Sequence, residues 1–381
     1  MRVLHTSDWH LGRSFHQVPM LNAQENFLDH LVAVVRSERV EAVVVAGDVY
    51  DRALPPVDAV TLLDEALDRL VDTGAAVLVT SGNHDSAQRL GFGSRRSARA
   101  GLHLRTRPDV LAEPVLLEDR HGPVALYGLP YLEPGLVADQ LGVARRHADV
   151  LAEAMDRVRA DLAGRPDGTR SVVAAHAFVT GAEPSSSERD ISVGGVDSAP
   201  RSTFAGVDYV ALGHLHGPQR LSDTVRYSGS PLPYSFSEHS HTKGSWLVDL
   251  DAGGVAAVEQ VAAPVHRRLA VLRGRLDELL TDAAHAPAES CFCQVVLTDP
   301  ERSRDPMERL RTRFPHTVSL VFEPEGRRAE APSYADRVRG LGEAELCCAF
   351  LDDVRGRGAS ETERELFGRA LEADRMVEAG R

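Results

Sequence analysis

The chain has 381 residues, of which 43% are hydrophobic, which is enough for two domains or for one large domain with an appendage. It contains no run of 18 apolar residues, and its start, MRVLHTSDWH, is typical of a strand, so we expect neither a signal peptide nor a membrane span and predict a cytoplasmic protein. The net charge of −13 argues against nonspecific nucleic-acid binding by the whole surface, and the only lysine, Lys243 in HTKGSW, is not in a Walker A loop, which excludes a P-loop ATPase.

The first half of the chain alternates short apolar strands with amphipathic helices. RVLHTSD predicts a strand, and the helical spacing of Phe27 and Leu31 predicts a helix near 24–38. EAVVVAGD, a helix near 57–72 and AAVLVTSGNHD follow in the same alternation. Later strands are predicted at VALYGLPY, SVVAAHAFV, DYVALGHLH, VRYSGSP and SWLVDLD. This order predicts a layered α/β domain over residues 1–262.

The remaining chain has a different character. From residue 266 it has the pattern strand, helix, strand, helix, strand, which predicts a small α+β domain over 266–330. Short helices are expected over 333–381, with a capping box at Ser360 and Glu363. One of these helices carries an apolar stripe formed by Leu346, Phe350, Leu351 and Val354. The stripe is either core or a surface for a partner, because little chain remains to pack against it.

Side chains that commonly bind metals follow five of the predicted strands. In chain order they are Asp8 and His10, then Asp48, then Asn83, His84 and Asp85, then His176, and finally His214 and His216. Sites in α/β sheets form at the carboxyl ends of strands, and alternate residues of an extended segment point to one side. The sequence therefore predicts that these residues converge on a binuclear metal site.

The types of side chain also indicate which metals and substrates would suit this site. An imidazole-rich set disfavours magnesium and suits manganese, iron or zinc. Asp48 has two carboxylate oxygens and can bridge two metals about 3.5–4 Å apart. Two divalent cations held by two carboxylates keep about two positive charges, which a phosphodiester can partly neutralise.

The strings DWH, GDVYD, GNHD, AHAF and GHLH resemble the motifs of the calcineurin-like metallophosphoesterase superfamily. The longer strings HTSDWHLGR, GDVYDRALPP, GNHDSAQRL, SSSERDISVGG, ALGHLHGPQ and YSGSPLPYSFSE are similar to its DNA-repair branch, the SbcD-type nuclease subunits of bacterial SbcCD complexes. The resemblance implies an αββα sandwich with a smaller α+β capping domain and a helical C-terminal tail.

The resemblance also assigns roles to individual residues. It implies a first metal held by Asp8, His10, Asp48 and His216. It implies a second metal held by Asp48, Asn83, His176 and His214. His84 would donate a proton to the leaving oxygen, and either Asp85 or Asp51 would orient it. Arg13 and the turn Ser228-Gly229-Ser230 are candidate phosphate contacts.

The implied activity is that of a two-metal, manganese-dependent DNA nuclease, both a 3′–5′ double-strand exonuclease and a single-strand endonuclease, in DNA replication, repair and recombination. The implied partners are DNA and an SbcC-type coiled-coil ATPase, in a nucleoid-associated heterotetramer that contains a homodimer of this chain. The helices of 333–381 would bind the ATPase. The arginine-rich stretch Ser86–Pro108, which has no acidic residue before Asp109, is either a DNA track or a solvated surface. The alternatives are another metallophosphoesterase, such as a phosphatase or cyclic-nucleotide phosphodiesterase, or a largely structural scaffold for the ATPase.

Overall fold

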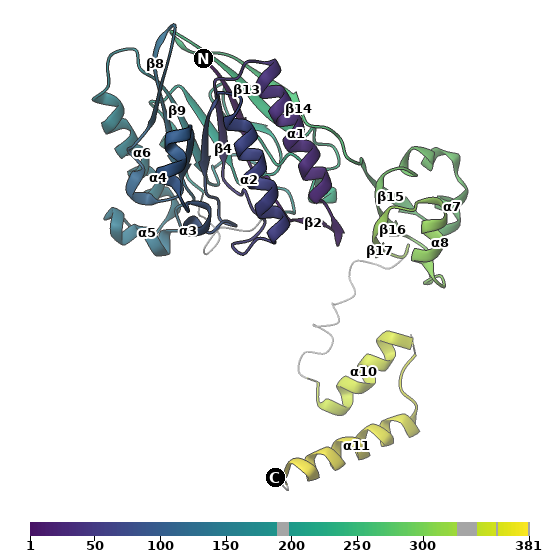
Figure 1. Ribbon diagram of the computed structural model, residues 1–381. Coiled ribbons are helices and arrows are strands. Elements are labelled where there is room, and N and C mark those ends of the chain that lie inside the picture. Colours follow the sequence, from purple (N-terminus) through teal and green to yellow (C-terminus); the bar gives the residue numbers. More distant parts are fainter. Residues whose placement is uncertain (189–197, 326–340, 356, 380–381) are drawn as a thin grey trace. The chain divides into compact units, whose positions relative to one another are not determined.

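The computed structural model describes residues 1–188, 198–325, 341–355 and 357–379. Contacts divide the chain into two compact units, Met1–Val296 with Arg304–Val321, and Leu297–Ser303 with Phe322–Arg381. The first unit contains two six-stranded sheets (Figure 1). In spatial order, the first sheet consists of β14 (Gly254–Ala262), β13 (Gly244–Asp251), β1 (Arg2–Thr6), β4 (Ala42–Ala46), β5 (Ala76–Thr80) and β6 (Leu102–Arg105). The second consists of β11 (Gln219–Arg220), β12 (Val225–Tyr227), β10 (Tyr209–Gly213), β9 (Arg170–His176), β8 (Gly122–Leu129) and β7 (Val115–Asp119).

The central strands of both sheets are parallel. In the first sheet, β1 pairs with β4 and β4 with β5, so that His5 lies opposite Val44 and Val44 opposite Leu78. In the second sheet, β9 pairs in parallel with β10, and Gly213 lies opposite His176. Parallel pairing brings the carboxyl ends of neighbouring strands to one edge of each sheet.

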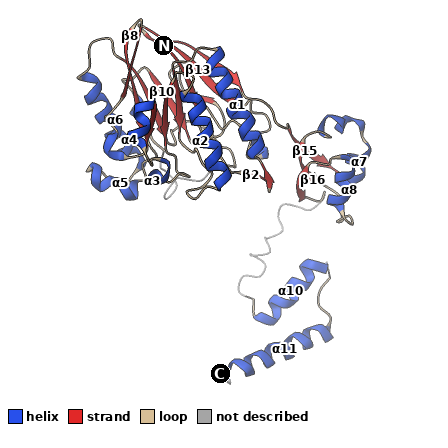
Figure 2. Ribbon diagram, in the orientation of Figure 1, coloured by secondary structure: helices blue, strands red, loops and turns tan. Residues whose placement is uncertain are grey.

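The two sheets pack face to face, and helices cover their outer faces (Figure 2). Small and branched side chains form the layer between the sheets, with Val44 and Leu78 from one sheet in the same cluster as Val172 and Ala211 from the other. Fully burying one such valine or leucine stabilises the fold by about 1.5–3 kcal/mol. The helices α1 (Leu21–Ser37) and α2 (Val57–Val71) cover the first sheet, and α5 (Pro134–Leu141) and α6 (His147–Ala163) cover the second. The predicted αββα architecture is confirmed.

The helices predicted near 24–38 and 57–72 are α1 and α2. The apolar face of α1 is buried as the spacing of Phe27 and Leu31 predicts. Its start lies at Leu21, earlier than predicted, because Gln24 in its first turn is a buried polar residue that breaks the apolar pattern. Shorter elements of this unit are β2 (Ser14–Phe15), β3 (Val18–Pro19), α3 (Ala87–Leu90) and α4 (Ser94–Ser97).

The region after residue 266 has the predicted order of elements. They are β15 (Leu269–Gly274), α7 (Leu276–Thr281), β16 (Phe292–Leu297), α8 (Pro306–Arg313) and β17 (Thr317–Phe322). The three strands form one sheet in the order β15-β16-β17. The predicted boundary between residues 330 and 333 lies outside the described residues.

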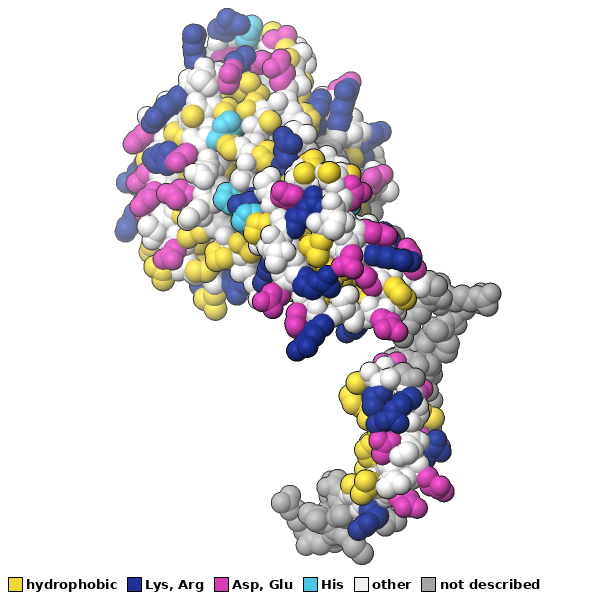
Figure 3. Space-filling view, turned by 90° about the vertical axis from the view of Figure 1, so that its right-hand side faces the viewer, with side chains coloured by type: hydrophobic (Ala, Val, Ile, Leu, Met, Phe, Trp, Pro, Cys, Tyr) yellow, Lys and Arg dark blue, Asp and Glu magenta, His cyan; other side chains and the backbone are white. Residues whose placement is uncertain are grey.

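The C-terminal helices are α10 (Glu343–Arg355) and α11 (Glu361–Ala379). The predicted capping box is present, because the main-chain N–H of Ser360 donates to Glu363 Oε2 at 2.8 Å and the N–H of Glu363 donates to Ser360 Oγ at 3.4 Å. Within the described part of the chain, no helix is both long and apolar enough to cross a membrane. On the face drawn in Figure 3, basic and acidic side chains are interspersed over the first unit.

Candidate metal centre

The predicted ligands converge where five strands of the two sheets end. Asp8 and His10 follow β1, Asp48 follows β4, Asn83 follows β5, His176 ends β9, and His214 and His216 follow β10. All of them except Asn83, which is half-buried, are buried. The two facing sheets therefore supply one shared site, as the positions of these residues after the strands predict.

The first group of ligand atoms comes from Asp8, His10 and His216, with one ligand atom of each lying within 4.8 Å of the others. The Nε2 atoms of His10 and His216 are only 3.0 Å apart. Two imidazole nitrogens that approach so closely can direct their lone pairs at one cation.

The second group comes from Asp48, His176 and His214, which meet the same criterion. Asn83 joins it, because its Oδ1 lies 2.9 Å from His176 Nε2. Asp48 Oδ2 lies 3.5 Å from His176 Nε2 and 3.6 Å from His10 Nε2. Asp48 therefore lies between the two groups, where a carboxylate can bridge two cations.

His84 lies beside both groups. It forms a third group with His10 and Asp48, its ring packs edge-on against His10 at 4.6 Å between centroids, and its Nε2 is 4.0 Å from Asp48 Oδ2. Its Nδ1 is 2.6 Å from the main-chain carbonyl oxygen of Asp51. Because a carbonyl only accepts, Nδ1 is the donor, and Nε2 is the nitrogen that can gain or lose a proton.

The same reasoning fixes the tautomer of His176. Its Nδ1 lies 3.0 Å from the carbonyl oxygen of Ala46, to which it must donate. In the neutral ring, Nε2 is then the nitrogen with a free lone pair, and it faces Asn83 and Asp48. His176 is therefore preset as a ligand through Nε2.

The backbone is strained at four of the predicted ligands. Asp8, His10, Asp48 and His214 have φ angles of 53°, 46°, 49° and 108°. A residue other than glycine in this region costs about 1–3 kcal/mol, and such residues concentrate at functional sites. Surrounding contacts maintain the strain; for example, the N–H of His214 donates to Asp8 Oδ1 at 3.0 Å.

Two glycines let the ligand loops approach closely. A Cβ at Gly47 would overlap the His176 imidazole, and a Cβ at Gly82 would overlap the Asp48 carboxylate. Glycine is thus required in both GD and GN motifs by the proximity of a ligand from another strand.

Burial determines the electrostatics of the site. It lowers the pKa of His10 and of His214 well below the usual value, with neighbouring imidazoles adding to the effect, so both rings are neutral and able to bind a metal. Burial also raises the pKa of Asp8, and the charge of Asp48 raises it further. Buried carboxylates that repel each other beside neutral imidazoles fit a pair of divalent cations, which would supply the missing positive charge.

Of the two residues expected to orient His84, Asp51 contacts the ring through its main-chain carbonyl, and the Asp85 carboxylate binds main-chain N–H groups. The Asp85 carboxylate accepts hydrogen bonds from the main-chain N–H groups of Val49, Tyr50 and Gly82 at 2.9–3.1 Å. It therefore links the loop after β4, which carries Asp48, to the loop after β5, which carries Asn83. Burial, followed by the charge of Asp48, raises the pKa of Asp85 to about 7. Asp51 contacts His84 through its main-chain carbonyl, whereas its carboxylate lies 3.7 Å from Arg13 Nε.

A pocket of about 540 Å³ opens beside His84 and is also lined by Arg13, Ser14, Asp51, Arg52 and Ser187. Arg13 therefore stays a candidate phosphate contact. In the other candidate contact, the turn Ser228-Gly229-Ser230, both hydroxyls are buried and bonded within the protein, Ser228 to Ser7 and Ser230 to the carbonyl of Leu232. Arg13 is therefore the better placed of the two.

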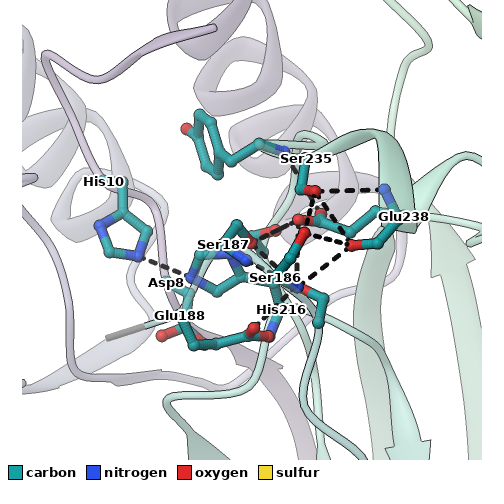
Figure 4. A network of polar contacts seen from close by, with 12 residues as sticks. Asp8, His10, Ser186, Ser187, Glu188, His216, Ser235 and Glu238 are labelled. Carbon is teal, nitrogen blue, oxygen red and sulfur yellow. Dashed lines mark hydrogen bonds and ion pairs between the residues drawn. The ribbon is translucent and has the colours of Figure 1, made fainter. Parts of the chain in front are cut away.

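Several residues that support the ligands were given no role by the sequence, although Ser187, Glu188 and Glu238 lie in the strings SSSERDISVGG and YSGSPLPYSFSE. Gln24 is buried on α1, where it donates to the carbonyl of His10 at 2.8 Å and accepts from the N–H of Gly12 at 3.0 Å. Behind His216, Ser187, Glu188 and Glu238 form a polar network (Figure 4), and Lys243 joins it. The single lysine of the sequence, Lys243, was the signal that could have pointed to this network, because a buried lysine needs a charged partner.

Comparison with known proteins gives two family matches. Residues 1–218, more than half of the chain, match the family described as calcineurin-like phosphoesterase. Residues 265–355 match the SbcD C-terminal domain, which is described as the type 5 capsule protein repressor C-terminal domain.

The solved structures matched by the comparison share little sequence with this chain. A protein from Thermus thermophilus has 12% identity and a TM-score of 0.38 over 68% of this chain and 98% of its own. A dimetal phosphatase from Danio rerio has 15% identity and a TM-score of 0.42 over 69% of this chain and 99% of its own.

Proposed function

Because the chain belongs to the calcineurin-like phosphoesterase family, we propose that it is a DNA nuclease of the SbcD type that cleaves phosphodiester bonds. The observation that carries the proposal is the pair of ligand groups, Asp8 with His10 and His216, and Asp48 with His176 and His214. They lie at one edge of an αββα fold, and His84 lies beside both.

The site residues divide into metal ligands and residues that act on the substrate. Asp8, His10, Asp48 and His216 would hold one divalent cation, and Asp48, Asn83, His176 and His214 the other. The imidazole-rich set disfavours Mg²⁺, and Mn²⁺ is the proposed metal because the chain resembles manganese-dependent nucleases of the SbcD type. Such a pair supplies Lewis-acid polarisation of the phosphate and a water nucleophile at neutral pH. The chain's own task is to hold neutral imidazoles and ionised carboxylates in place.

His84 is the proposed general acid. Its Nδ1–H is anchored on the carbonyl of Asp51, so the ring is held with Nε2 toward the ligand groups. A protonated Nε2 can donate to the oxygen that leaves phosphorus, which contributes about 10²–10⁴-fold to such reactions. Arg13, at the edge of the same pocket, is proposed to contact a phosphate oxygen. Asp85 and Asp51 act on His84 through the backbone of their loops.

The proposal of DNA as substrate rests on the match of residues 265–355 to the SbcD C-terminal domain. On this basis, residues 1–262 are the nuclease domain, 266–330 a capping domain that faces DNA, and 333–381 the docking segment for an SbcC-type ATPase. The arginines between Ser86 and Pro108 would track the DNA backbone. The proposed role is in DNA end processing, repair and recombination. The chain would form a homodimer within a heterotetramer that is cytoplasmic and associated with the nucleoid.

The test is digestion of end-labelled linear duplex and single-stranded DNA with Mn²⁺, with and without the ATPase. Metal-dependent shortening of the labelled strands supports the proposal. Hydrolysis of a small phosphodiester or phosphomonoester, without cleavage of DNA even when the ATPase and ATP are present, would indicate another phosphoesterase. Absence of all hydrolysis by a metal-loaded protein that binds the ATPase would indicate a scaffold.

A further inference from the structure

His216 is held at three separate atoms by residues outside the two ligand groups. Its ring Nδ1 lies 2.5 Å from Ser187 Oγ, and its main-chain N–H donates to Glu188 Oε1 at 2.7 Å. Its main-chain carbonyl accepts from Lys243 Nζ at 2.7 Å. These contacts come from two segments, one containing Ser187 and Glu188, the other containing Lys243, and Figure 4 shows part of the network that they form.

A buried ion pair lies behind this network. Lys243 Nζ is 2.5 Å from Glu238 Oε2, and the two side chains are 8% and 0% exposed. The other oxygen of the carboxylate, Glu238 Oε1, lies 2.5 Å from Ser187 Oγ. A carboxylate paired with a buried ammonium is ionised, so both of its oxygens only accept hydrogen bonds.

The direction of each hydrogen bond follows from this constraint. The Ser187 hydroxyl has one proton and must donate it to Glu238 Oε1, because two acceptors at that separation would repel. The same hydroxyl oxygen can then only accept from His216 Nδ1, which therefore carries the proton. The lone pair of the neutral ring is left on Nε2, the atom that lies 3.0 Å from His10 Nε2.

We propose that Ser187, Glu238 and Lys243 are positioning residues that fix His216 in the Nδ1–H tautomer and direct its Nε2 at the first metal. These residues form a relay, a chain of hydrogen bonds that leads from Lys243 through Glu238 and Ser187 to the His216 imidazole. A hydrogen bond from a ligating histidine to a carboxylate, here through a hydroxyl, orients the ring and raises its basicity. The inference rests on the proposed metal centre and predicts an effect on one of its two sites.

The relay also ties the first metal to the segment 185–188. Ser187 reaches both His216 and Glu238, whereas the neighbouring Ser186 hydroxyl bonds to the hydroxyls of Ser235 and Ser237. Ser186 thus holds the same segment without touching the ligand. This difference gives a matched pair of variants, each of which removes one hydroxyl.

The experiment compares Ser187→Ala with Ser186→Ala and with Ser187→Thr in the full-length chain. Mn²⁺ binding is followed by calorimetry, and by electron paramagnetic resonance for the occupancy of each site. We expect Ser187→Ala to weaken one of the two sites by about 10–100-fold and to leave the other unchanged. Ser187→Thr, which keeps the hydroxyl, and Ser186→Ala should bind both ions as the native chain does.

A second readout needs no metal. Long-range ¹H–¹⁵N spectra of histidine-labelled, metal-free protein should show His216 as the Nδ1–H tautomer in the native chain and in Ser187→Thr. In Ser187→Ala this preference should be lost.

Glu238→Gln tests the link between Ser187 and Glu238. The amide keeps the shape of the side chain but removes the negative charge of the carboxylate that accepts the hydrogen bond from Ser187. We expect the same single-site loss, with the fold checked by circular dichroism. The inference is overturned if Ser187→Ala keeps both affinities and the tautomer, or if Ser186→Ala weakens the site equally, which would make docking of the segment the cause. A native chain that binds no Mn²⁺ would instead refute the metal centre.

Discussion

The Nε2 atoms of His10 and His216 lie 3.0 Å apart, although the two residues are separated by 206 positions and follow strands of different sheets. Contacts from other residues hold each of the two histidines in place. The main chain of His10 is held by Gln24, and His216 is held by Ser187, Glu188 and Lys243. Two sheets packed face to face, with the carboxyl ends of their strands on the same side, thus bring together imidazoles that are far apart in the sequence.

Asp48 lies between the two ligand groups, so its replacement should affect both metals. We expect Asp48→Asn to lose the thermal stabilisation that Mn²⁺ gives to the native chain, which is about 2.7 kcal/mol at 100 times the dissociation constant. Thermal melts with and without Mn²⁺ measure it. Asp58→Asn, an exposed aspartate in the first turn of α2, is the control and should keep the stabilisation. Equal metal responses in the two variants would contradict the placement of Asp48.

Gly82 is predicted to be essential for metal binding although it has no side chain. In Gly82→Ala the new Cβ would overlap the Asp48 carboxylate, which must move away from the position between the two groups. We expect Mn²⁺ affinity to fall by at least about tenfold, as for other changes that misplace a ligand. Gly135→Ala is the control, since the nearest atom to its Cβ is 3.7 Å away. Unaltered Mn²⁺ affinity in Gly82→Ala would refute the argument from close approach.

The ion pair between Arg170 and Asp119 predicts a pH-dependent stability far from the metal centre. Its side chains are 2% and 6% exposed, and the guanidinium of Arg170 holds the pKa of Asp119 well below its usual range. A lowered pKa in the folded state means that the pair stabilises the fold above about pH 4, the usual aspartate value, and that this contribution is lost as the pH falls below it. We expect Asp119→Asn to cost about 3–5 kcal/mol at pH 7.

Urea denaturation of both proteins at pH 7 and near pH 3 tests this expectation. The difference between native and Asp119→Asn should narrow at the lower pH. Asp109→Asn, which breaks the solvent-exposed pair with Arg107, is the control and should change the stability far less than Asp119→Asn does at pH 7. A difference for Asp119→Asn that is the same at both pH values would contradict the assignment.

If the proposed function holds, the apolar stripe on α10 is the expected docking surface for the ATPase. Leu346, Phe350 and Val354 follow at intervals of four residues and are 41%, 56% and 64% exposed. We expect Phe350→Glu combined with Val354→Glu to abolish binding of an SbcC-type ATPase, because charge would be buried in the interface. Hydrolysis of a small phosphodiester should be unchanged, and Asp352→Ala should bind normally. Binding at native affinity by the double variant would place the interface elsewhere.

The sequence could predict most of the fold because apolar periodicity and ligand motifs coincide. Val44 and its neighbours form a buried run that ends directly before Asp48, so strand, turn and ligand are all visible in EAVVVAGD. The same holds for β10 and the pair His214 and His216. The roles of Ser187, Glu238 and Lys243 could not be predicted, because polar contacts between distant segments have no periodicity. The hydrogen bond from His84 to the main-chain carbonyl of Asp51 could not be predicted either, because any residue type can supply a main-chain carbonyl.

The most direct measurement is digestion of end-labelled duplex DNA with Mn²⁺ by the native chain and by His84→Gln, with metal content determined for both. Glutamine keeps a polar side chain of similar reach and cannot act as a general acid. We predict that His84→Gln binds both metals, because His84 belongs to neither ligand set, and cleaves DNA about 10²–10⁴-fold more slowly. Cleavage by His84→Gln at the native rate, with both metals bound, would contradict the account.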